Sequence, residues 1–247
     1  MATPLADHAV NFRNFWDMLT PQEQSTLRAR SSVNRYGKDT VIVAEGTATS
    51  QVTVIRSGWA KGATIKADRP VLLRLYGPGE LIGLSAALTG TAPAETVTVT
   101  CHELHAMTLS TRSFVDFLRR ASNASSALHR MQQWRLEEAD RLRTIRDYPT
   151  AAQRLAGLLV ELCRPENDPI HHLDGTISVP TSGASLSQQD LGSWIGDSRK
   201  TVVRALADLR KMELTSNAGL PRHIRITDPA RLRGFAAAAD AGTGTPP

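Results

Sequence analysis

The chain of 247 residues has only two cysteines, Cys101 and Cys163, and an aromatic content of 5%. Two distant cysteines in no paired motif indicate reduced thiols rather than a disulfide framework, and they are too few to hold an iron–sulfur cluster alone. No apolar run approaches the ~18 residues of a membrane span, and the N-terminus lacks a basic start followed by an apolar core. These absences predict a cytoplasmic protein with no membrane partner and no cofactor.

Charge of either sign is modest, and its distribution is uneven. The chain carries 29 Lys and Arg against 24 Asp and Glu, which gives a formal net charge of +5. Residues 185–234 hold nine Lys and Arg against five Asp and Glu, so most of the basic excess lies in this stretch. A local basic excess suits a polyanionic partner such as nucleic acid. A hydrophobic content of 41% over this length is typical of a globular protein with about two domains.

The first half of the chain has the pattern of an all-β domain. A short helix is predicted first, with Thr20 as its N-cap and Pro21 at its first position. After Tyr36, β-branched segments recur at about 10-residue spacing, each followed by a glycine turn, and the pattern ends near Ser110. This spacing predicts a closed roll or sandwich. The segment 79–95 interrupts it and is predicted to form a short helix and a loop.

Beyond Phe114 the hydrophobic period becomes helical, and the helix is expected to end at Tyr148, because the residue before Pro149 is disfavoured in the helical conformation. One interpretation is a helix lying on its own β-domain. We favour a dimerisation helix, because a polar interruption in an apolar seam can fix the register of two helices. The predicted interface consists of Ala121, Leu128, Met131, Arg135, Glu138, Leu142 and Ile145.

A second domain is predicted to open with a helix whose leucines 155, 158, 159 and 162 share one face. A polar connector with a short strand at Thr176–Val179 follows. The stretch 186–214 then reads as two helices joined by a turn at Gly196, with Ser187 capping the first and Asp197 and Ser198 capping the second. In the second helix Val202, Leu206 and Leu209 form the buried face.

The second helix begins with cations. Arg199 and Lys200 directly follow the cap, and Arg204 lies one turn further on. Cations at this end oppose the helix dipole, so a phosphate or base partner explains them better than a solvated helix face. After Leu214 a turn and a strand are predicted, which would place Arg222, His223 and Arg225 to touch phosphate.

The stretch "LSQQDLGSWIGDSRKTVVRALADLRKMEL" resembles the C-terminal helix-turn-helix of the Crp/Fnr family of bacterial transcription regulators. The order of β-roll, long helix and winged helix also resembles that family, from about Leu19 to Gly234. The family opens its recognition helix with Ser-Arg-acidic-Thr-Val-x-Arg, whereas Lys200 stands here at the acidic position. Lysine cannot accept a hydrogen bond from cytosine, so it would favour guanine or phosphate. The resemblance implies DNA contacts by Ser187, Gln188, Ser198, Arg199, Lys200, Thr201, Val203, Arg204, Lys211 and Arg222.

The stretch "YGPGELIGLSAALTGTAPAETVTV" resembles the phosphate-binding cassette of the same family. Members that bind cyclic AMP have Pro-Arg-Ser-Ala on the far side of the loop, where this chain has Pro93-Ala94-Glu95-Thr96. The arginine is lost at Ala94 and a carboxylate is gained at Glu95, which would repel phosphate, so cyclic AMP is not the expected effector. Another effector, a vestigial pocket and control from outside the chain remain open. The implied pocket residues are Gly79, Glu80, Leu81, Gly83, Ala94, Glu95 and Arg135.

The sequence thus predicts an α+β fold with five parts: an N-terminal arm (1–18), a cyclic-nucleotide-binding-like β-roll sensor (19–115), a dimerisation helix (116–148), a winged helix-turn-helix (149–235) and a flexible tail (236–247). The predicted function is a homodimeric, sequence-specific regulator of transcription, with double-stranded DNA of near-palindromic sequence and RNA polymerase as partners.

Two other classes of protein share parts of this pattern. One is an interaction scaffold whose helix-turn-helix is only structural. The other is a cupin-like enzyme, which would need clustered histidines around an open metal site. On a strand, His102 and His105 would point to opposite faces, so no metal site and no catalytic residue is predicted. The candidates for redox or haem ligands are His102, His105, His129, Cys101 and Cys163, each more ordinary as a surface or packed residue.

Overall fold

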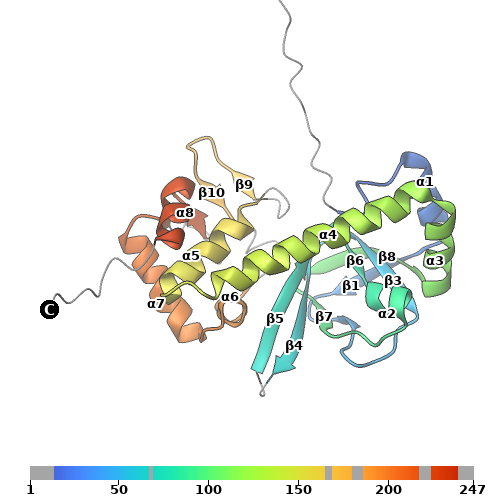
Figure 1. Cartoon of the computed structure of the whole chain (residues 1–247), viewed down its shortest axis with the longest axis horizontal. Helices are drawn as coiled ribbons and strands as arrows, with labels where there is room; N and C mark the ends of the chain where they lie inside the picture. The colour runs from blue at the N-terminus through green and yellow to red at the C-terminus, as the bar shows by residue number, and fades with distance from the viewer. Residues whose placement is uncertain (1–13, 67–68, 165–168, 180–185, 217–223, 239–247) are drawn as a thin grey trace, which may run out of the picture.

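The computed structural model of the chain describes residues 14–66, 69–164, 169–179, 186–216 and 224–238. A β-rich N-terminal part and a helical C-terminal part are joined by one long helix, α4 (Figure 1). The N-terminal elements are α1 (Pro21–Ala29), β1 (Ser32–Gly37), β2 (Val41–Val43), β3 (Gln51–Ser57), β4 (Ala60–Lys66), β5 (Arg69–Tyr76), β6 (Leu81–Ile82), α2 (Leu84–Thr89), β7 (Thr96–Val99), β8 (Glu103–Ser110) and α3 (Thr111–Arg120).

The strands form a roll of two antiparallel four-stranded sheets, in the orders β1-β8-β3-β6 and β2-β7-β4-β5. Ile55, Val97 and Leu104 pack in the core of the roll. The predicted all-β domain and its end at Ser110 are confirmed. The strands β1 and β4 were not predicted, because both are rich in polar or small residues; their pairing with β8, β5 and β7 holds them in place.

The N-terminal segment is part of this domain from residue 14 onwards. Phe15 is fully buried, and the Trp16 ring lies against the guanidinium groups of Arg28 and Arg56, at 4.9 and 4.0 Å from its centroid. The boundary predicted at residue 18 therefore lies too far along the chain. Phe12, the remaining aromatic residue of the predicted arm, lies outside the described residues.

The helical segment after the roll is broken in two. Ser110 caps α3, which ends at Ala121, a residue with extended backbone (φ −117°, ψ 90°). The long helix α4 (Ser122–Ile145) therefore starts six residues later than predicted and has no side-chain cap of its own. Glu23 of α1 replaces the cap: its carboxylate accepts the backbone N–H of Ala124 at 3.0 Å and caps α1 as well.

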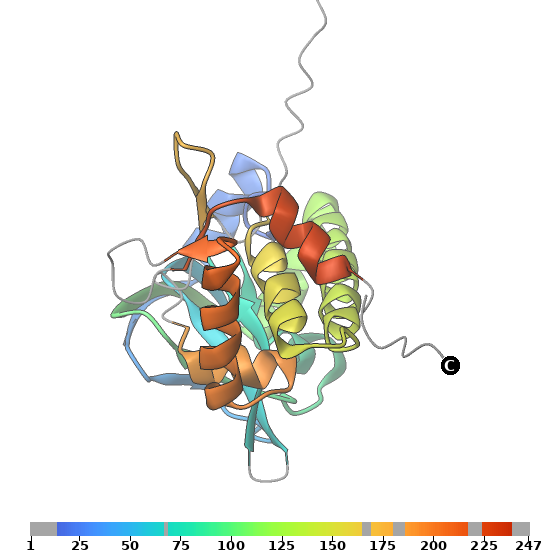
Figure 2. The same ribbon diagram turned by 90° about the vertical axis from the view of Figure 1, so that its left-hand side faces the viewer.

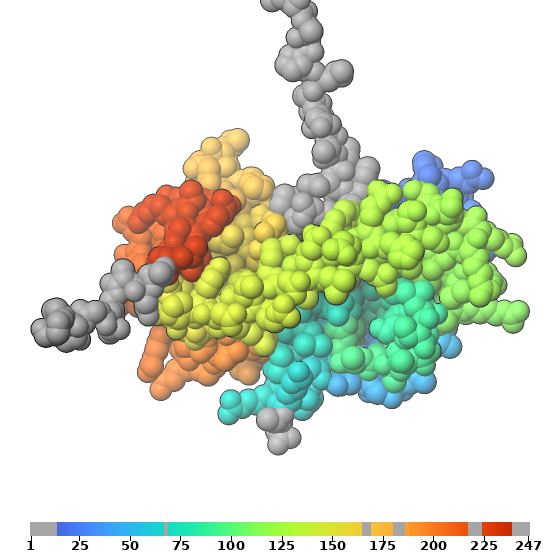
Figure 3. Space-filling model, in the orientation of Figure 1, coloured from blue at the N-terminus to red at the C-terminus, as the bar shows by residue number. Residues whose placement is uncertain are grey.

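The seam predicted for dimerisation packs mainly on its own protomer, which corrects that prediction. Leu128 and Met131 are buried in a core with Phe15 and α3. Further along α4, Ile145 is buried, Arg135 turns to the roll, and Ala121, Glu138 and Leu142 are half-buried. An apolar stripe predicts a buried face but not the identity of its partner. Leu136, next to Arg135, is 63% exposed, and the outer side of α4 forms an uncovered ridge (Figure 3).

The C-terminal part is a small helical domain with a short sheet in the order β11-β12-β10-β9 (Figure 2). Its core combines the predicted leucines 155, 158, 159 and 162 with Leu191, Val202 and Leu206. Its elements are α5 (Ala151–Leu162), β9 (Ile170–His171), β10 (Ile177–Ser178), α6 (Gln188–Ile195), α7 (Arg199–Lys211), β11 (Thr215–Ser216), β12 (Arg225–Ile226) and α8 (Pro229–Ala237).

The β4–β5 hairpin of the roll touches the C-terminal domain at α6 (Figure 1). Leu72 is buried in the C-terminal core, and its backbone N–H donates to Ser193 Oγ at 2.6 Å. Lys61 Nζ lies 2.6 Å from Asp190 Oδ1. The β-roll thus holds α6 directly, in addition to the covalent link through α4. Among the described helices, none is long and apolar enough to cross a membrane.

Candidate nucleic-acid interface and effector pocket

Helices α6 and α7 form the predicted helix-turn-helix. Ser187 and Asp190 make a reciprocal capping box at the start of α6, and Gly196 ends α6 with a positive φ of 78°, which favours glycine. Close packing also requires Gly192, because a Cβ there would lie 2.7 Å from the carbonyl oxygen of Asp197. These residues fix the angle at which α7 leaves α6.

One face of α7 is buried and the other carries a basic end. Ser198 caps the helix by accepting the Thr201 N–H at 3.1 Å. Arg199, Lys200 and Arg204, which we call the basic end of α7, are exposed and form no ion pair within the described part of the chain. Val203 lies among them and is 44% exposed. Unpaired cations at a helix N-terminus are suited to phosphate or to guanine edges, and an exposed methyl group to thymine.

Asp197 does not cap α7. Its carboxylate instead accepts hydrogen bonds from Arg154 of α5, at 3.1 Å from Nε and 2.9 Å from Nη2, and both side chains are largely buried. Arg154 also donates to the carbonyl oxygen of Tyr148 at 2.8 Å. This pair neutralises the acidic group nearest the basic end, so the positive charge there faces outward uncompensated.

Other predicted DNA contacts are distributed unevenly. Ser187 is exposed and Gln188 half-exposed at the start of α6. Lys211 lies at the opposite end of α7, about 18 Å along the axis from Arg199, and pairs with Asp208 at 3.7 Å. The structure therefore does not bring Lys211 to the basic end.

The predicted wing is described only in part. Arg225 donates to Thr176 Oγ1 at 2.5 Å and to Asp174 Oδ2 at 2.9 Å, so its role within the described residues is to tie β12 to the turn before β10. This corrects its assignment as a free phosphate ligand. Arg222 and His223 lie outside the described residues.

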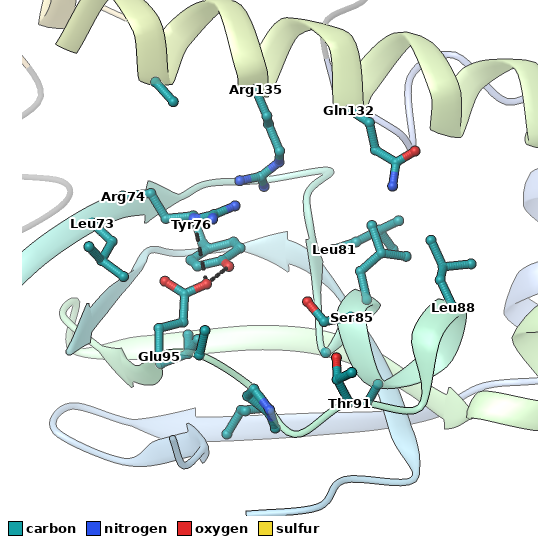
Figure 4. A pocket seen from close by; sticks show the side chains of 18 of the residues that line it. Leu73, Arg74, Tyr76, Leu81, Ser85, Leu88, Thr91, Glu95, Gln132 and Arg135 are labelled. Carbon is teal, nitrogen blue, oxygen red and sulfur yellow. Dashed lines mark hydrogen bonds and ion pairs between the residues drawn. The ribbon is translucent and has the colours of Figure 1, made fainter. Parts of the chain in front are cut away.

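A cavity of about 670 Å³ opens between the roll and α4 (Figure 4). We call it the effector cavity. Of the predicted pocket residues, Leu81, Gly83, Ala94, Glu95 and Arg135 line it, while Gly79 and Glu80 do not. Sequence reasoning missed several lining residues: Arg74, Tyr76, Ser85, Leu88, Thr91, Gln132 and Glu138. Gln132 and Glu138 lie three residues before and three residues after Arg135, on the same face of the helix. This spacing is the signal that would predict both residues once Arg135 is assigned to the pocket.

The charged groups at one end of the effector cavity bond to one another. The Tyr76 hydroxyl donates to Glu95 Oε1 at 2.5 Å, and Arg74 Nε lies 3.5 Å from the same oxygen. The Arg135 guanidinium lies 5.0 Å from the centroid of the Tyr76 ring and donates to Glu80 Oε1 at 3.0 Å. Burial raises the pKa of Tyr76, so the phenol remains a hydrogen-bond donor.

Glu80 is engaged on both oxygens, because its Oε2 accepts the backbone N–H of Gly77 at 2.8 Å. It therefore holds the turn before β6 and fixes Arg135, which corrects its assignment to a ligand. Glu138 is the third carboxyl group near the cavity. Burial and the neighbouring Glu80 raise the pKa of Glu138, and it forms no hydrogen bond or ion pair with another described residue.

The described histidines and cysteines do not gather at one site. Among the described residues, no group of three His, Cys, Asp or Glu side chains is placed to hold a metal ion. His105 bonds to its neighbour Glu103 at 2.9 Å, and His102 lies before β8 rather than on it, so the argument about strand faces does not apply. Cys101 accepts the N–H of Trp59 at 3.2 Å. Burial raises the pKa of Cys163 to about 12, which leaves an unreactive thiol.

Comparison with protein families agrees with both halves of this description. Residues 33–121 match the model of the cyclic nucleotide-binding domain, and residues 153–235 match that of the Crp-like helix-turn-helix domain. Together these ranges take in more than half of the chain. The chain belongs to the Crp/Fnr family. Related proteins in this family are transcription regulators, not enzymes, so the chain is a transcription regulator with a helix-turn-helix DNA-binding domain.

Solved structures of the Crp/Fnr type share the fold. A mutant of CooA from Carboxydothermus hydrogenoformans is 18% identical, with a TM-score of 0.73 over 91% of this chain and 96% of that one. FixK2 from Bradyrhizobium japonicum is 22% identical, with a TM-score of 0.69 over 85% and 98%. The c-di-GMP responsive regulator CLP from Xanthomonas campestris is 17% identical, with a TM-score of 0.67 over 85% and 100%. No curated protein matches the sequence significantly.

Proposed function

We propose that the protein is a homodimer that binds a near-palindromic DNA site, inserts α7 into the major groove, and does not require cyclic AMP. The observation that carries the proposal is the basic end of α7: three cations, Arg199, Lys200 and Arg204, are exposed and have no ion-pair partner among the described residues, beside a neutralised Asp197. Groove contacts of this kind supply about 1–3 kcal/mol per well-matched base, and the phosphate contacts make binding depend on salt.

The geometry of the helix-turn-helix supports base contact rather than phosphate contact alone. Arg199, Lys200, Val203 and Arg204 occupy positions i, i+1, i+4 and i+5 on α7, so they share the face opposite the buried Val202. The N-terminal turns of a recognition helix are those that reach base edges. Lysine and arginine donors favour guanine, and the Val203 methyl groups suit the methyl group of thymine.

Dimerisation is proposed on the outer face of α4. The helix is about 36 Å long, and its inner face is already occupied by the roll. Leu136 and Ala139 are exposed on α4 at the rim of the effector cavity, beside the outer face of the helix, which is uncovered in Figure 3. Apolar residues on an uncovered helix face fit a helix of a second copy. A two-fold dimer would set two recognition helices about 34 Å apart, one turn of DNA.

Independence from cyclic AMP is proposed from the effector cavity. Ala94 and Glu95 stand where cyclic-AMP-binding relatives have arginine and serine. The only cations on the cavity wall, Arg74 and Arg135, are paired with Glu95 and Glu80 among the described residues. A cyclic phosphate would have to break one of these pairs and lie beside a carboxylate, which is unfavourable in a partly buried site.

The test is a selection of genomic DNA fragments with purified, ligand-free protein, followed by titration of the selected site at two salt concentrations. We expect one near-palindromic motif and an affinity that falls as salt rises. The absence of an enriched motif would contradict the proposal. Sedimentation of Leu136→Lys tests the dimer separately: we expect monomers, with Glu137→Lys on the exposed side of the same helix as the matched control.

A further inference from the structure

The charged groups at the polar end of the effector cavity are balanced. Arg74 Nε lies 3.5 Å from Glu95 Oε1, and Arg135 Nη2 lies 3.0 Å from Glu80 Oε1. Glu138 adds a third carboxyl group to the wall of the cavity. A ligand with a negative charge would therefore enter a site without a positive excess, and a ligand with a positive charge would lie against two guanidinium groups. The balance favours a neutral ligand.

The same arginines keep hydrogen-bond donors that no described residue accepts. Arg135 donates to Glu80 through Nη2, whereas its Nε and Nη1 have no acceptor in the described part of the chain. The contact of Arg74 with Glu95, at 3.5 Å, is an ion pair beyond the usual length of a hydrogen bond, so the N–H groups of Arg74 also remain available. The Arg135 side chain is only 15% exposed. Donors in such a partly buried site gain from an acceptor inside the cavity.

These donors are held in place before any ligand binds. The guanidinium groups of Arg135 and Arg74 lie 5.0 and 5.8 Å from the centroid of the Tyr76 ring, whose hydroxyl donates to Glu95. Figure 4 shows Arg135 and Gln132 extending from α4 into the same cavity. Side chains that are already fixed by a ring and by carboxylates lose little freedom when a ligand accepts from them.

The remaining walls of the cavity are largely apolar. Leu81, Leu88 and Val97 line it on the side of the roll and α2 (Figure 4). A volume of about 670 Å³ is in the range of small-molecule sites. The cavity therefore combines an apolar wall with donors at one end, which suits an apolar body that carries an acceptor.

We infer that the effector cavity takes a neutral molecule with an apolar body and a hydrogen-bond acceptor, such as the carbonyl group of an ester or a ketone. The inference rests on the proposed function, because it assigns a ligand class to the sensor of that regulator. The carbonyl oxygen accepts from Arg135 and Arg74, and the apolar body lies along Leu81 and Leu88. Both ion pairs stay intact, because the ligand uses only the N–H groups that these pairs leave over.

The experiment uses full-length protein and three compounds that share one apolar body: methyl phenylbutyrate, phenylbutyrate and phenylbutylamine. The first is a neutral acceptor without a donor, the second an anion and the third a cation. Binding is measured by ligand-observed NMR titration, because compounds with about a dozen heavy atoms bind in roughly the millimolar range. We expect the ester to bind at least about fivefold more tightly than either charged compound. A smaller preference, a preference for a charged compound or no binding at all would overturn the inference.

One variant separates hydrogen bonding from apolar contact. Arg74→Met removes the N–H groups and makes the wall more apolar, so an ester held by apolar contact alone would bind at least as tightly as to the wild type. We expect binding that is weaker by at least about fivefold. The matched control is Arg69→Met at the exposed start of the same strand, which should leave the affinity unchanged. Undiminished ester binding in Arg74→Met, or an equal loss in the control, would overturn the inference.

A second pair of variants tests Arg135 without leaving its carboxylate alone. Glu80→Gln keeps an acceptor for the Gly77 N–H, and Arg135→Met/Glu80→Gln then removes the guanidinium group as well. The ester should bind the double variant at least about fivefold more weakly than it binds Glu80→Gln. Equal affinities in the two variants would contradict the role of Arg135 as a donor. If the double variant does not fold, Arg74→Met still decides the question.

DNA titration of the wild-type protein without any compound separates the two proposals. Sequence-specific DNA binding together with no preference for the ester removes only the ligand class. Loss of sequence-specific DNA binding removes the regulator itself.

Discussion

The basic end of α7 and the polar end of the effector cavity handle charge in opposite ways. At α7, the nearby carboxylate of Asp197 is occupied by Arg154, and three cations are left exposed without an ion-pair partner in the part of the chain that the structure describes. In the cavity, by contrast, cations and carboxylates face one another: Arg74 lies 3.5 Å from Glu95, and Arg135 donates to Glu80. Unpaired cations at α7 indicate an anionic partner, whereas the charged groups of the cavity are largely balanced against one another.

The largest effect is expected when the unpaired cations of the basic end of α7 are removed. Arg199→Ala/Arg204→Ala should lower affinity for the selected DNA site by about 100- to 1000-fold and reduce the salt slope by about 2. Titration at several salt concentrations measures both. Arg119→Ala/Arg120→Ala removes the same charge from the exposed end of α3 and should have little effect. Comparable losses in the two double variants would show that only net charge matters.

Breaking the pair that neutralises Asp197 should have the next largest effect. Arg154→Met leaves a largely buried carboxylate alone, at a cost of about 3 kcal/mol in the free energy of unfolding. It should also weaken DNA binding, because the carboxylate then opposes phosphate near the basic end. Denaturant unfolding and DNA titration give the two values. Arg154→Met/Asp197→Asn should recover part of both, and a double variant worse than the single one would refute this account.

Substitution of Lys200 tests which base α7 contacts in each half-site. Lys200→Glu replaces a donor by an acceptor, so preference at one base pair of each half-site should move from guanine towards cytosine by about 1–3 kcal/mol. Repeating the fragment selection with this variant reveals the change. An unaltered motif would assign Lys200 to phosphate rather than to a base.

The smallest effect is expected in the cavity. Burial and then the neighbouring Glu80 raise the pKa of Glu138, while Arg135, Arg74 and Arg141 partly offset the shift. Because the pKa is raised, the folded state prefers the protonated carboxyl group. Ionisation at neutral pH therefore costs stability, and this cost disappears as the pH falls below the ordinary value of 4.5. Glu138→Gln should raise the free energy of unfolding by up to about 1 kcal/mol at pH 8, with no gain at pH 4. A gain that is independent of pH would point to packing instead.

The sequence predicted what depends on local signals. Capping residues such as Thr20, Ser187 and Ser198, the turn glycine Gly196 and the periodic leucines of α5 all have the predicted roles. These signals act within a few residues of one another, and their chemistry is specific.

What the sequence did not predict depends on distant partners. Glu23 capping α4, Arg154 binding Asp197 and Glu80 binding Arg135 all join residues 43 or more positions apart. The periodicity of α4 likewise predicted a buried face, but only the fold shows that the roll covers it. For the same reason the cavity residues on β5 were missed, since nothing in their sequence indicates which face they present.

The central claim is that α7 is ready to bind DNA while the cavity rejects cyclic AMP. The most direct measurement is titration of the selected DNA site with and without a saturating concentration of cyclic AMP. The account predicts dissociation constants that agree within about twofold, because the nucleotide does not bind and so cannot shift the equilibrium. Tightening by tenfold or more, about 1.4 kcal/mol of coupling, would contradict it.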